Sequence, residues 1–333
     1  MGGKGRRAVA AAVAGLVIMS MVSLALREPA GALPAPWSGL VRPPRLPAVP
    51  SPGIPDGAAA VSGKGMFVWL WEPVGPPAGV VEQAKQLGLS FLVVRASDAT
   101  DDFYLRAVLD DLLPRAHASG IAVVAYDPPQ FAPVEHDVDR AKRVMSYRDP
   151  TGGSLDGFAA DIEVAADENL TDHILYYGQL LRAAAPEGMP LIAIVYPPQQ
   201  FPSFPFEALL PSFDVVMPMD YWRADSQSSA SYVADSVRLL APLGKPVSVI
   251  GQAFAFGEDQ IDELAEYPTA DEVRGSVEAA HTEGAIGVSF WVWHTANESV
   301  WDALRQTDWP ASHRAPRAAA LASRVLPPRA AAG

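Results

Sequence analysis

The chain has 333 residues, of which 49% are hydrophobic and 19% charged, a composition ordinary for one large globular domain or two small ones. The absence of cysteine excludes disulfides, thiolate metal sites and a cysteine nucleophile. The formal net charge of -13 repels nucleic acid, and no basic stripe with interleaved aromatic residues is present, so we expect no nucleic-acid partner.

The first 32 residues have the pattern of an export segment. Lys4, Arg6 and Arg7 precede an apolar run from Ala8 to Leu26, and residues 30–32 offer an A-x-A cleavage site. The run is long for a signal peptide and just long enough to span a bilayer. Residues 1–32 are therefore either a cleaved signal or an N-terminal membrane anchor. Because the basic cluster precedes the run, the rest of the chain is expected outside the cytoplasm, secreted or anchored.

Composition divides the remainder into three parts. Residues 33–62 contain PAPW, RPPRLP and PSPGIP, which favour an extended polyproline-II linker. Residues 310–333 are rich in Ala, Arg and Pro and are expected to form a disordered tail. Residues 63–309 are then the folded domain.

Strand-like and helix-like segments alternate through this domain. The strand candidates are near-continuous apolar runs, as expected for parallel strands buried on both faces; they are Met66–Trp71, Phe91–Arg95, Ile121–Tyr126, Gly157–Glu163, Leu191–Tyr196, Val215–Met219, Val247–Gly251 and Gly287–Trp293. The helix candidates are Val80–Leu87, Phe103–Ala118, Asp137–Tyr147, Asp172–Ala185, Tyr232–Ala241, Ala270–Thr282 and a last helix starting near Ser299. Between the fifth and sixth strands, the segment Phe206–Leu210 is short and Pro-rich, so it predicts a helix less strongly than the other helix candidates do.

Eight such units in about 245 residues predict an α/β fold of the (β/α)8 TIM-barrel type, whose usual size is about 250 residues. A doubly wound open sheet is the alternative. The segment around the first strand, GKGMFVWLWEPVGPP, has no G-x-G-x-x-G, which argues against a nicotinamide enzyme. No P-loop sequence is present either, and we expect no cofactor.

The sequence LDGFAADIEV, Leu155 to Val164, carries two carboxylates two residues apart, Asp161 and Glu163. Strand side chains alternate between faces, so Ala159, Asp161 and Glu163 should all point into the barrel. Two acids there repel each other unless one carries a proton or a substrate separates them. Such pairs often perform general acid/base chemistry on glycosidic bonds. The alternative is an acid pair that is solvated or bound to Arg or Lys.

In a barrel the active site lies at the carboxyl ends of the strands. The substrate-binding candidates there are Trp71, Arg95, Asp98, Asp127, Tyr196, Trp222, Trp291 and Trp293, with Asp220 and Tyr221 also following the sixth strand. Aromatic faces stack on sugar rings while acids bond the hydroxyls. Some of these tryptophans are expected in the core, Asp127 precedes two prolines and can simply start a turn, and Arg95 can pair with the acid pair instead. The histidines show no H-E-x-x-H pattern, so no metal site is predicted.

At these residues the chain resembles the chitinase-like family-18 glycoside hydrolases. Their fourth strand carries D-G-x-D-x-D-x-E; here Asp156, Gly157, Asp161 and Glu163 match it and Ala159 replaces the middle acid. Their sixth strand carries M-x-Y-D, where this chain reads MPMDY with Asp and Tyr reversed, and a Trp like Trp291 ends their eighth strand. Family-25 lysozyme-like barrels, which also place D-x-E at a strand end, are a second resemblance.

The family-18 resemblance implies roles for the matching residues. Glu163 would be the general acid that protonates the leaving oxygen. Asp161 would orient a substrate acetamide that attacks the anomeric carbon, or stabilise the developing positive charge directly. Tyr221 or Asp220 would hold that acetamide, and Trp291 would form the floor of the sugar site.

Two functions follow as expectations. The first is an exported or membrane-anchored glycosidase acting on a polysaccharide such as a cell-wall glycan or an amino-sugar polymer. The second is a catalytically inactive barrel that binds glycans at the cell envelope, which Ala159 and the reversed Asp-Tyr order favour. An envelope protein that uses the barrel as a partner surface is a third class, without a supporting motif.

Overall fold

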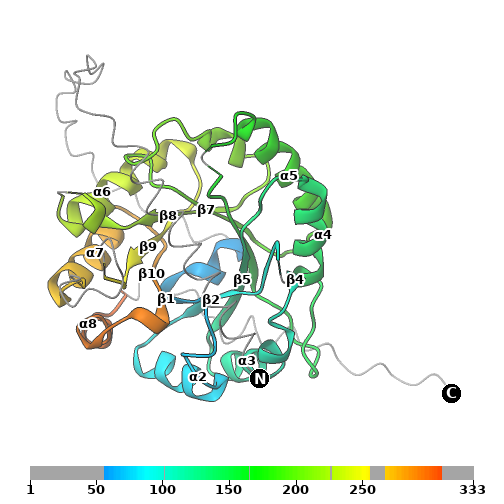
Figure 1. The fold of residues 1–333 in the computed structure, drawn as a ribbon. Coiled ribbons are helices and arrows are strands. Elements are labelled where there is room, and N and C mark those ends of the chain that lie inside the picture. Colours follow the sequence, from blue (N-terminus) through cyan, green and yellow to red (C-terminus); the bar gives the residue numbers. More distant parts are fainter. Residues whose placement is uncertain (1–55, 101, 165, 226, 256–266, 310–333) are drawn as a thin grey trace, which may run out of the picture. The chain divides into compact units, whose positions relative to one another are not determined.

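Eight parallel strands close into a barrel, which confirms the predicted (β/α)8 architecture (Figure 1). The computed structural model describes residues 56–100, 102–164, 166–225, 227–255 and 267–309, and all of these belong to one compact unit. The barrel strands are β1 (Gly63–Val68), β2 (Phe91–Arg95), β5 (Ala122–Asp127), β6 (Gly157–Asp161), β7 (Leu191–Val195), β8 (Val215–Asp220), β9 (Ser248–Gln252) and β10 (Gly287–Trp291). Each pairs with the next along the chain, and β10 pairs with β1 to close the barrel.

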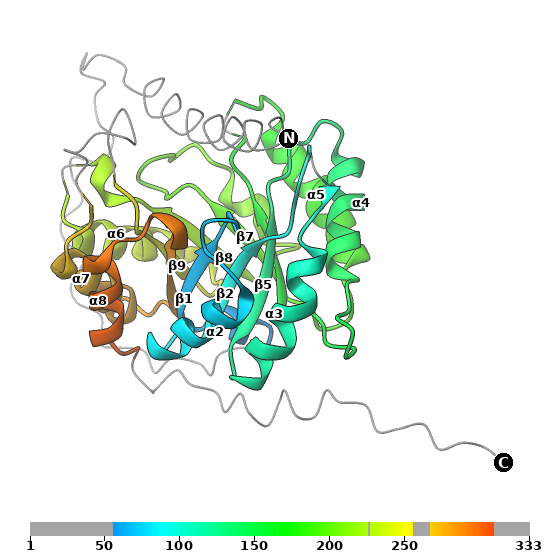
Figure 2. The ribbon, with the colours of Figure 1, turned by 60° about the horizontal axis from the view of Figure 1, so that its bottom comes forward.

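Helices surround these strands (Figure 2). They are α2 (Pro77–Gln86), α3 (Arg106–Ala118), α4 (Val134–Met145), α5 (Leu170–Ala184), α6 (Ser229–Leu240), α7 (Ala270–Thr282) and α8 (Glu298–Gln306), with 3-10 turns η1 (Asp56–Val61), η2 (Phe206–Leu209), η3 (Trp222–Ala224), η4 (Ala241–Leu243) and η5 (Trp293–Thr295). A short hairpin of β3 (Ser97–Asp98) and β4 (Asp102–Phe103) follows β2. Each α-helix turns an apolar stripe to the barrel, as Leu109, Leu112, Leu113 and Ala116 do on α3.

Strand side chains alternate between the lumen and the helices, and this sorts every strand into two sets. On β2, Leu92 and Val94 belong to the core between strands and helices, whereas Phe91, Val93 and Arg95 face the lumen. The first strand begins three residues earlier than predicted, so Gly65 lies inside it. A β-carbon on Gly65 would lie 2.2 Å from the Phe91 ring, so the lumen has no room for a larger residue there.

The crossover from β7 to β8 is the one whose helix the sequence left doubtful. Only the 3-10 turn η2 forms there, preceded by Pro205. Three prolines within ten residues, Pro202, Pro205 and Pro211, remove backbone donors and prevent a regular α-helix.

Residues 56–61, which the sequence analysis placed in the linker, form η1 with Ala58 and Val61 buried. The Val61 carbonyl accepts a hydrogen bond from Ser248 at the start of β9, so η1 lies at the end of the barrel where the strands begin. Within the described ranges no helix has the length and apolarity that a bilayer span requires. The apolar run 8–26 and the segment 310–333 lie outside those ranges.

A buried lysine ties the first strand to the last helix. Lys64 of β1 is 2% exposed. Its Nζ donates to the carbonyl oxygens of Leu304 at 2.7 Å and Thr307 at 2.5 Å, at the carboxyl end of α8. A cation at this end also complements the helix dipole, so Lys64 satisfies carbonyl groups that the helix itself leaves unbonded.

Replacing Lys64 by Met should therefore lower the free energy of unfolding by about 2 kcal/mol or more, because charged hydrogen bonds to buried carbonyls are lost. Urea unfolding followed by circular dichroism measures this. The control is Lys85→Met, which removes an exposed ammonium from α2 and should change stability by less than about 0.5 kcal/mol. Equal losses in the two variants would contradict the assigned role of Lys64.

Candidate active site

The acid pair lies where the sequence predicts, at the carboxyl end of β6. Asp161 ends the strand and is 9% exposed, and Glu163 follows two residues later and is partly exposed. Arg95 on β2 acts electrostatically on both acids. Since β2 and β6 are not neighbouring strands, this interaction crosses the lumen, and all three side chains point into it.

Burial governs the protonation of the pair. It raises the pKa of Asp161 well above the usual range, and repulsion by the Glu163 carboxylate raises it further. Burial also raises the pKa of Glu163, against the hydrogen bond from Asp161 and the charge of Arg95, both of which lower it. Two carboxyl groups this close cannot both ionise easily in a low-dielectric site. The pair therefore keeps a proton to a higher pH than two separate, solvated carboxyl groups would, which is the direction that favours general acid/base chemistry.

A cation and an indole stand beside the pair. The Arg95 guanidinium forms an ion pair with Asp98 at 3.3 Å and lies 5.6 Å from the centre of the Trp69 ring. This places the predicted site residues Arg95 and Asp98 together at the barrel mouth, with Asp98 supplied by the β3–β4 hairpin.

Three tyrosines complete the polar part of the site. Tyr126 of β5, Tyr196 after β7 and Tyr221 after β8 are buried, and burial raises the pKa of each. The charges of Asp161 and Glu163 raise the pKa values of Tyr196 and Tyr221 further. The Tyr196 hydroxyl also donates to the Glu163 carbonyl at 3.2 Å. The phenols thus stay neutral and can donate hydrogen bonds to a bound ligand.

Trp291 forms an aromatic surface beside these groups. It ends β10, is partly exposed, and its ring centre lies 5.4 Å from Phe67, 5.7 Å from Trp69 and 6.0 Å from Tyr126. The peptide bond after it is cis. Trp69 is a site residue that the sequence analysis missed. The feature of the sequence that indicates Trp69 is its two-residue spacing from Phe67 of β1, because residues two apart along a strand direction point to the same face, here the lumen.

Two predicted acids are turned away from the lumen. Asp127 comes one residue after the lumen-facing Tyr126 and is fully buried. Arg140 of α4 donates to both of its oxygens at 2.8 Å, and Ser97 donates at 2.9 Å. Its prediction as a substrate-binding residue is therefore corrected: Asp127 joins β5 to α4 and does not reach a substrate.

Asp220 is the second acid that is turned away from the lumen. It follows the lumen-facing Met219 by one residue and is 0% exposed beneath α6. Burial raises its pKa well above the usual range, and Ser236 of α6 lowers it only in part. No hydrogen bond of regular geometry reaches either oxygen from the described residues. The proposed catalytic role of Asp220 is corrected, and of the reversed pair only Tyr221 contributes to the site.

Three predicted tryptophans belong to the packing between strands and helices. Trp222 is 1% exposed and lies over Gly251 of β9, where an added β-carbon would be 3.2 Å from its ring. Trp293 is buried against Trp301 of α8, with ring centres 5.2 Å apart. Trp71 is partly exposed but packs against the same core. The substrate-binding predictions for Trp222 and Trp293 are therefore corrected, since a ligand cannot reach rings that are buried this way.

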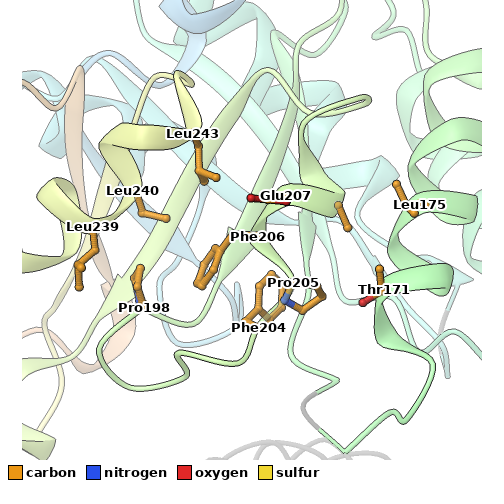
Figure 3. A pocket seen from close by; sticks show the side chains of 11 residues that line it. Thr171, Leu175, Pro198, Phe204, Pro205, Phe206, Glu207, Leu239, Leu240 and Leu243 are labelled. Atoms are coloured by element: carbon orange, nitrogen blue, oxygen red, sulfur yellow. The ribbon is translucent and has the colours of Figure 1, made fainter. Parts of the chain in front are cut away.

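Within the described part of the chain, no group of three His, Asp or Glu side chains is placed to hold a metal ion. A cavity of about 590 Å³ lies elsewhere, between α5, η2 and α6 (Figure 3). Its walls are mostly apolar, with Phe204, Phe206, Leu239 and Leu243 among the lining residues, and Glu207 also lines it. It lies beside the β7–β8 crossover, and neither acid of the pair lines it.

Asp220 yields a test of its own. Because its pKa is raised on folding, the stability it contributes is full below its unfolded pKa of about 3.9 and is lost as the pH rises through the folded value. Asp220→Asn removes this loss, so the variant should become more stable relative to the wild type as the pH rises from about 4, the ordinary pKa of an aspartate, toward the raised pKa of the folded protein. Urea unfolding at several pH values measures it. Asp235→Asn, on the exposed side of α6, is the control; a pH-independent difference for Asp220→Asn would refute the assignment.

Comparisons with known proteins support the fold. No protein-family model matches the chain, and no curated protein matches it in sequence. A chitinase from Rhizomucor miehei is 16% identical, over 73% of this chain and 98% of its own, with a TM-score of 0.55. A family-18 N-acetylglucosaminidase from Paenibacillus barengoltzii is 14% identical, over 74% and 99%, with a TM-score of 0.55. A chitinase-like agglutinin from Robinia pseudoacacia is 12% identical, over 74% and 99%, with a TM-score of 0.51. The chain thus has the (β/α)8 fold of chitinases and related glycoside hydrolases, as its resemblance implied.

Proposed function

We propose that the protein is a glycoside hydrolase that cleaves an amino-sugar polysaccharide by carboxylate acid catalysis. The observation that carries the proposal is the Asp161–Glu163 pair at the barrel mouth, in which burial raises the pKa of both carboxyl groups and repulsion by Glu163 raises that of Asp161 further. A proton held on a carboxyl group near neutral pH is what cleavage of a glycosidic bond needs. Partly exposed Trp291, whose ring centre lies 6.0 Å from Tyr126, supplies a surface on which a sugar ring can stack.

The two acids have different access, which assigns their roles. Glu163 is the more exposed and meets the leaving oxygen. It takes over the proton of the pair through the hydrogen bond from Asp161 and transfers it to that oxygen as the glycosidic bond breaks. Asp161, deeper in the lumen, is left as the carboxylate that orients the substrate acetamide. The acetamide oxygen attacks the anomeric carbon, and water later opens that intermediate and returns a proton to Glu163. Tyr221, whose buried phenol is neutral, holds the acetamide by a hydrogen bond.

The substrate class draws on the structures that share the fold. Two of them are named as a chitinase and a family-18 N-acetylglucosaminidase, and this chain retains the last two acids of the family pattern. The basic residues and apolar run at its start support export, so we propose a glycan outside the cytoplasm as the substrate.

A second candidate function is glycan binding without hydrolysis. Ala159 replaces an acid of the family pattern, and one structure of the same fold is named as a chitinase-like agglutinin. The two functions differ in whether Glu163 acts on a bond or only lies beside the sugar.

Glu163→Gln should abolish hydrolysis, because an amide cannot donate the proton, while sugar affinity stays within about twofold of the wild type. Release of reducing ends from chitin and from peptidoglycan measures turnover, and pull-down on the same polymers measures binding. Glu207→Gln, at the distant cavity, is the matched control and should remain active. Turnover by Glu163→Gln equal to that of the wild type would refute the general-acid role, and retention of glycan without hydrolysis by the wild type would favour the binding function.

Trp291→Ala should weaken binding of a soluble chitin oligosaccharide about tenfold, the loss of about 1.4 kcal/mol that removal of one stacking ring predicts. Isothermal titration calorimetry measures the affinity. Tyr176→Ala removes an exposed aromatic ring from α5 and should leave the affinity unchanged. Unaltered binding by Trp291→Ala would assign that ring to packing alone.

A further inference from the structure

Three residues share one layer of the barrel at the level of the missing acid. Arg95 of β2 is in register with Tyr126 of β5, and Tyr126 is in register with Ala159 of β6. By strand alternation all three face the lumen. Where the family-18 pattern has a carboxyl group, this chain therefore has a methyl group, with a phenol on the adjacent strand and a guanidinium one strand further.

Each of these neighbours has an unused polar atom, and so does Asp161. Arg95 Nε, Tyr126 Oη and Asp161 Oδ1 are buried, and no hydrogen-bond partner for them lies within the described residues. Tyr126 is 1% exposed and Asp161 9%. Buried polar atoms normally have partners. The two donors, Arg95 Nε and Tyr126 Oη, and the acceptor, Asp161 Oδ1, form no hydrogen bond with one another, so they are suited to hold the Asp161 carboxyl group through a bridging group.

The charge of Arg95 favours the same arrangement. It lowers the pKa of Asp161 and of Glu163, opposing the larger effect of burial on each. Its ion pair with Asp98 and its position over Trp69 hold the guanidinium beside the site. The charged and titratable groups around the acid pair are Arg95, Asp98, Tyr104, Tyr126, Asp127, Tyr196 and Tyr221. Among these groups, Arg95 carries the positive charge.

We propose that Arg95, assisted by Tyr126, is a positioning residue for the acid pair and replaces the function of the acid absent at position 159. The family arrangement adds a third carboxyl group that can take up a proton. This barrel instead adds a cation, which makes it easier to remove a proton from the acid pair. Either arrangement leaves Asp161 and Glu163 with a single proton between them. The inference rests on the proposed function, because a singly protonated pair has a purpose only if the site transfers that proton.

The experiment follows the carboxyl groups themselves and needs no substrate. The full chain is labelled with 13C at the carboxyl carbons of Asp and Glu, and the signals of the pair are assigned with Asp161→Asn and Glu163→Gln. In Arg95→Met the first proton should leave the pair at a pH about one unit or more above that of the wild type, since a neighbouring cation is removed. Arg95→Lys, which keeps the charge, should restore most of the difference, and Tyr126→Phe should show a smaller upward shift.

Arg106→Met is the control, because it removes an exposed arginine that lies over Phe103 and Tyr147 instead of at the acid pair. It should leave the titration unchanged. If Arg95→Met does not fold, Arg95→Gln gives the same comparison, with circular dichroism as the check on folding. A pair that titrates as in the wild type without the charge at position 95 would overturn the inference.

The outcome is separable from that of the proposed function. A wild-type protein that cleaves no glycan would refute hydrolysis, while the titration would still show whether Arg95 controls the proton. If the protein is active, the basic limb of its pH–rate profile should move upward in Arg95→Met and return with Arg95→Lys. If the enzyme is active and Arg95→Met leaves both its pH profile and its carboxyl titration unchanged, only the positioning role of Arg95 is contradicted.

Discussion

The two-residue period of the barrel strands is the constraint on which the site depends. Because the barrel is closed, every strand has one face in the lumen and one against the helices, and a shift of one residue moves a side chain from one environment to the other. Asp161 falls on the lumen face of β6 and becomes half of an acid pair. Asp127 and Asp220 fall on the outer faces of β5 and β8, one residue past lumen-facing Tyr126 and Met219, and neither can reach a ligand there.

The three buried aspartates show how neighbours decide what burial does. Asp127 meets a bidentate arginine and becomes a structural link between strand and helix. Asp220 has no regular hydrogen bond to either oxygen among the described residues, and Ser236 lowers its pKa only in part, so it favours the neutral form and destabilises the fold as the pH rises. Asp161 meets a second acid and a cation together, which leaves its proton transferable. Burial by itself favours the neutral form of all three carboxyl groups. Asp127 is held by an ion pair with Arg140, Asp220 lacks such a partner among the described residues, and Asp161 interacts with a second acid.

The ends of the chain's folded part are joined through the first strand. η1 lies at the end of the barrel where the strands begin, and Lys64 of β1 binds the carboxyl end of α8. The opposite end carries the acid pair, the tyrosines and Trp291, so stabilising contacts and candidate chemistry occupy different ends of one barrel, as in other barrels of this type. The apolar cavity by η2 belongs to neither end and results from the missing helix between β7 and β8.

Local patterns in the sequence determined the eight strand–helix units, the doubtful helix at Phe206–Leu210, and the common face of Asp161 and Glu163, because periodicity and proline content act within a few residues. They did not determine the exact phase at strand ends, which placed Asp127, Asp220, Trp222 and Trp293 wrongly and left Trp69 unnoticed. Nor could they pair Arg95 with Asp98 and set it beside Asp161, since β2 and β6 meet only across the lumen. Which side chains lie around the acid pair was decided by barrel closure, which brings distant segments to one mouth.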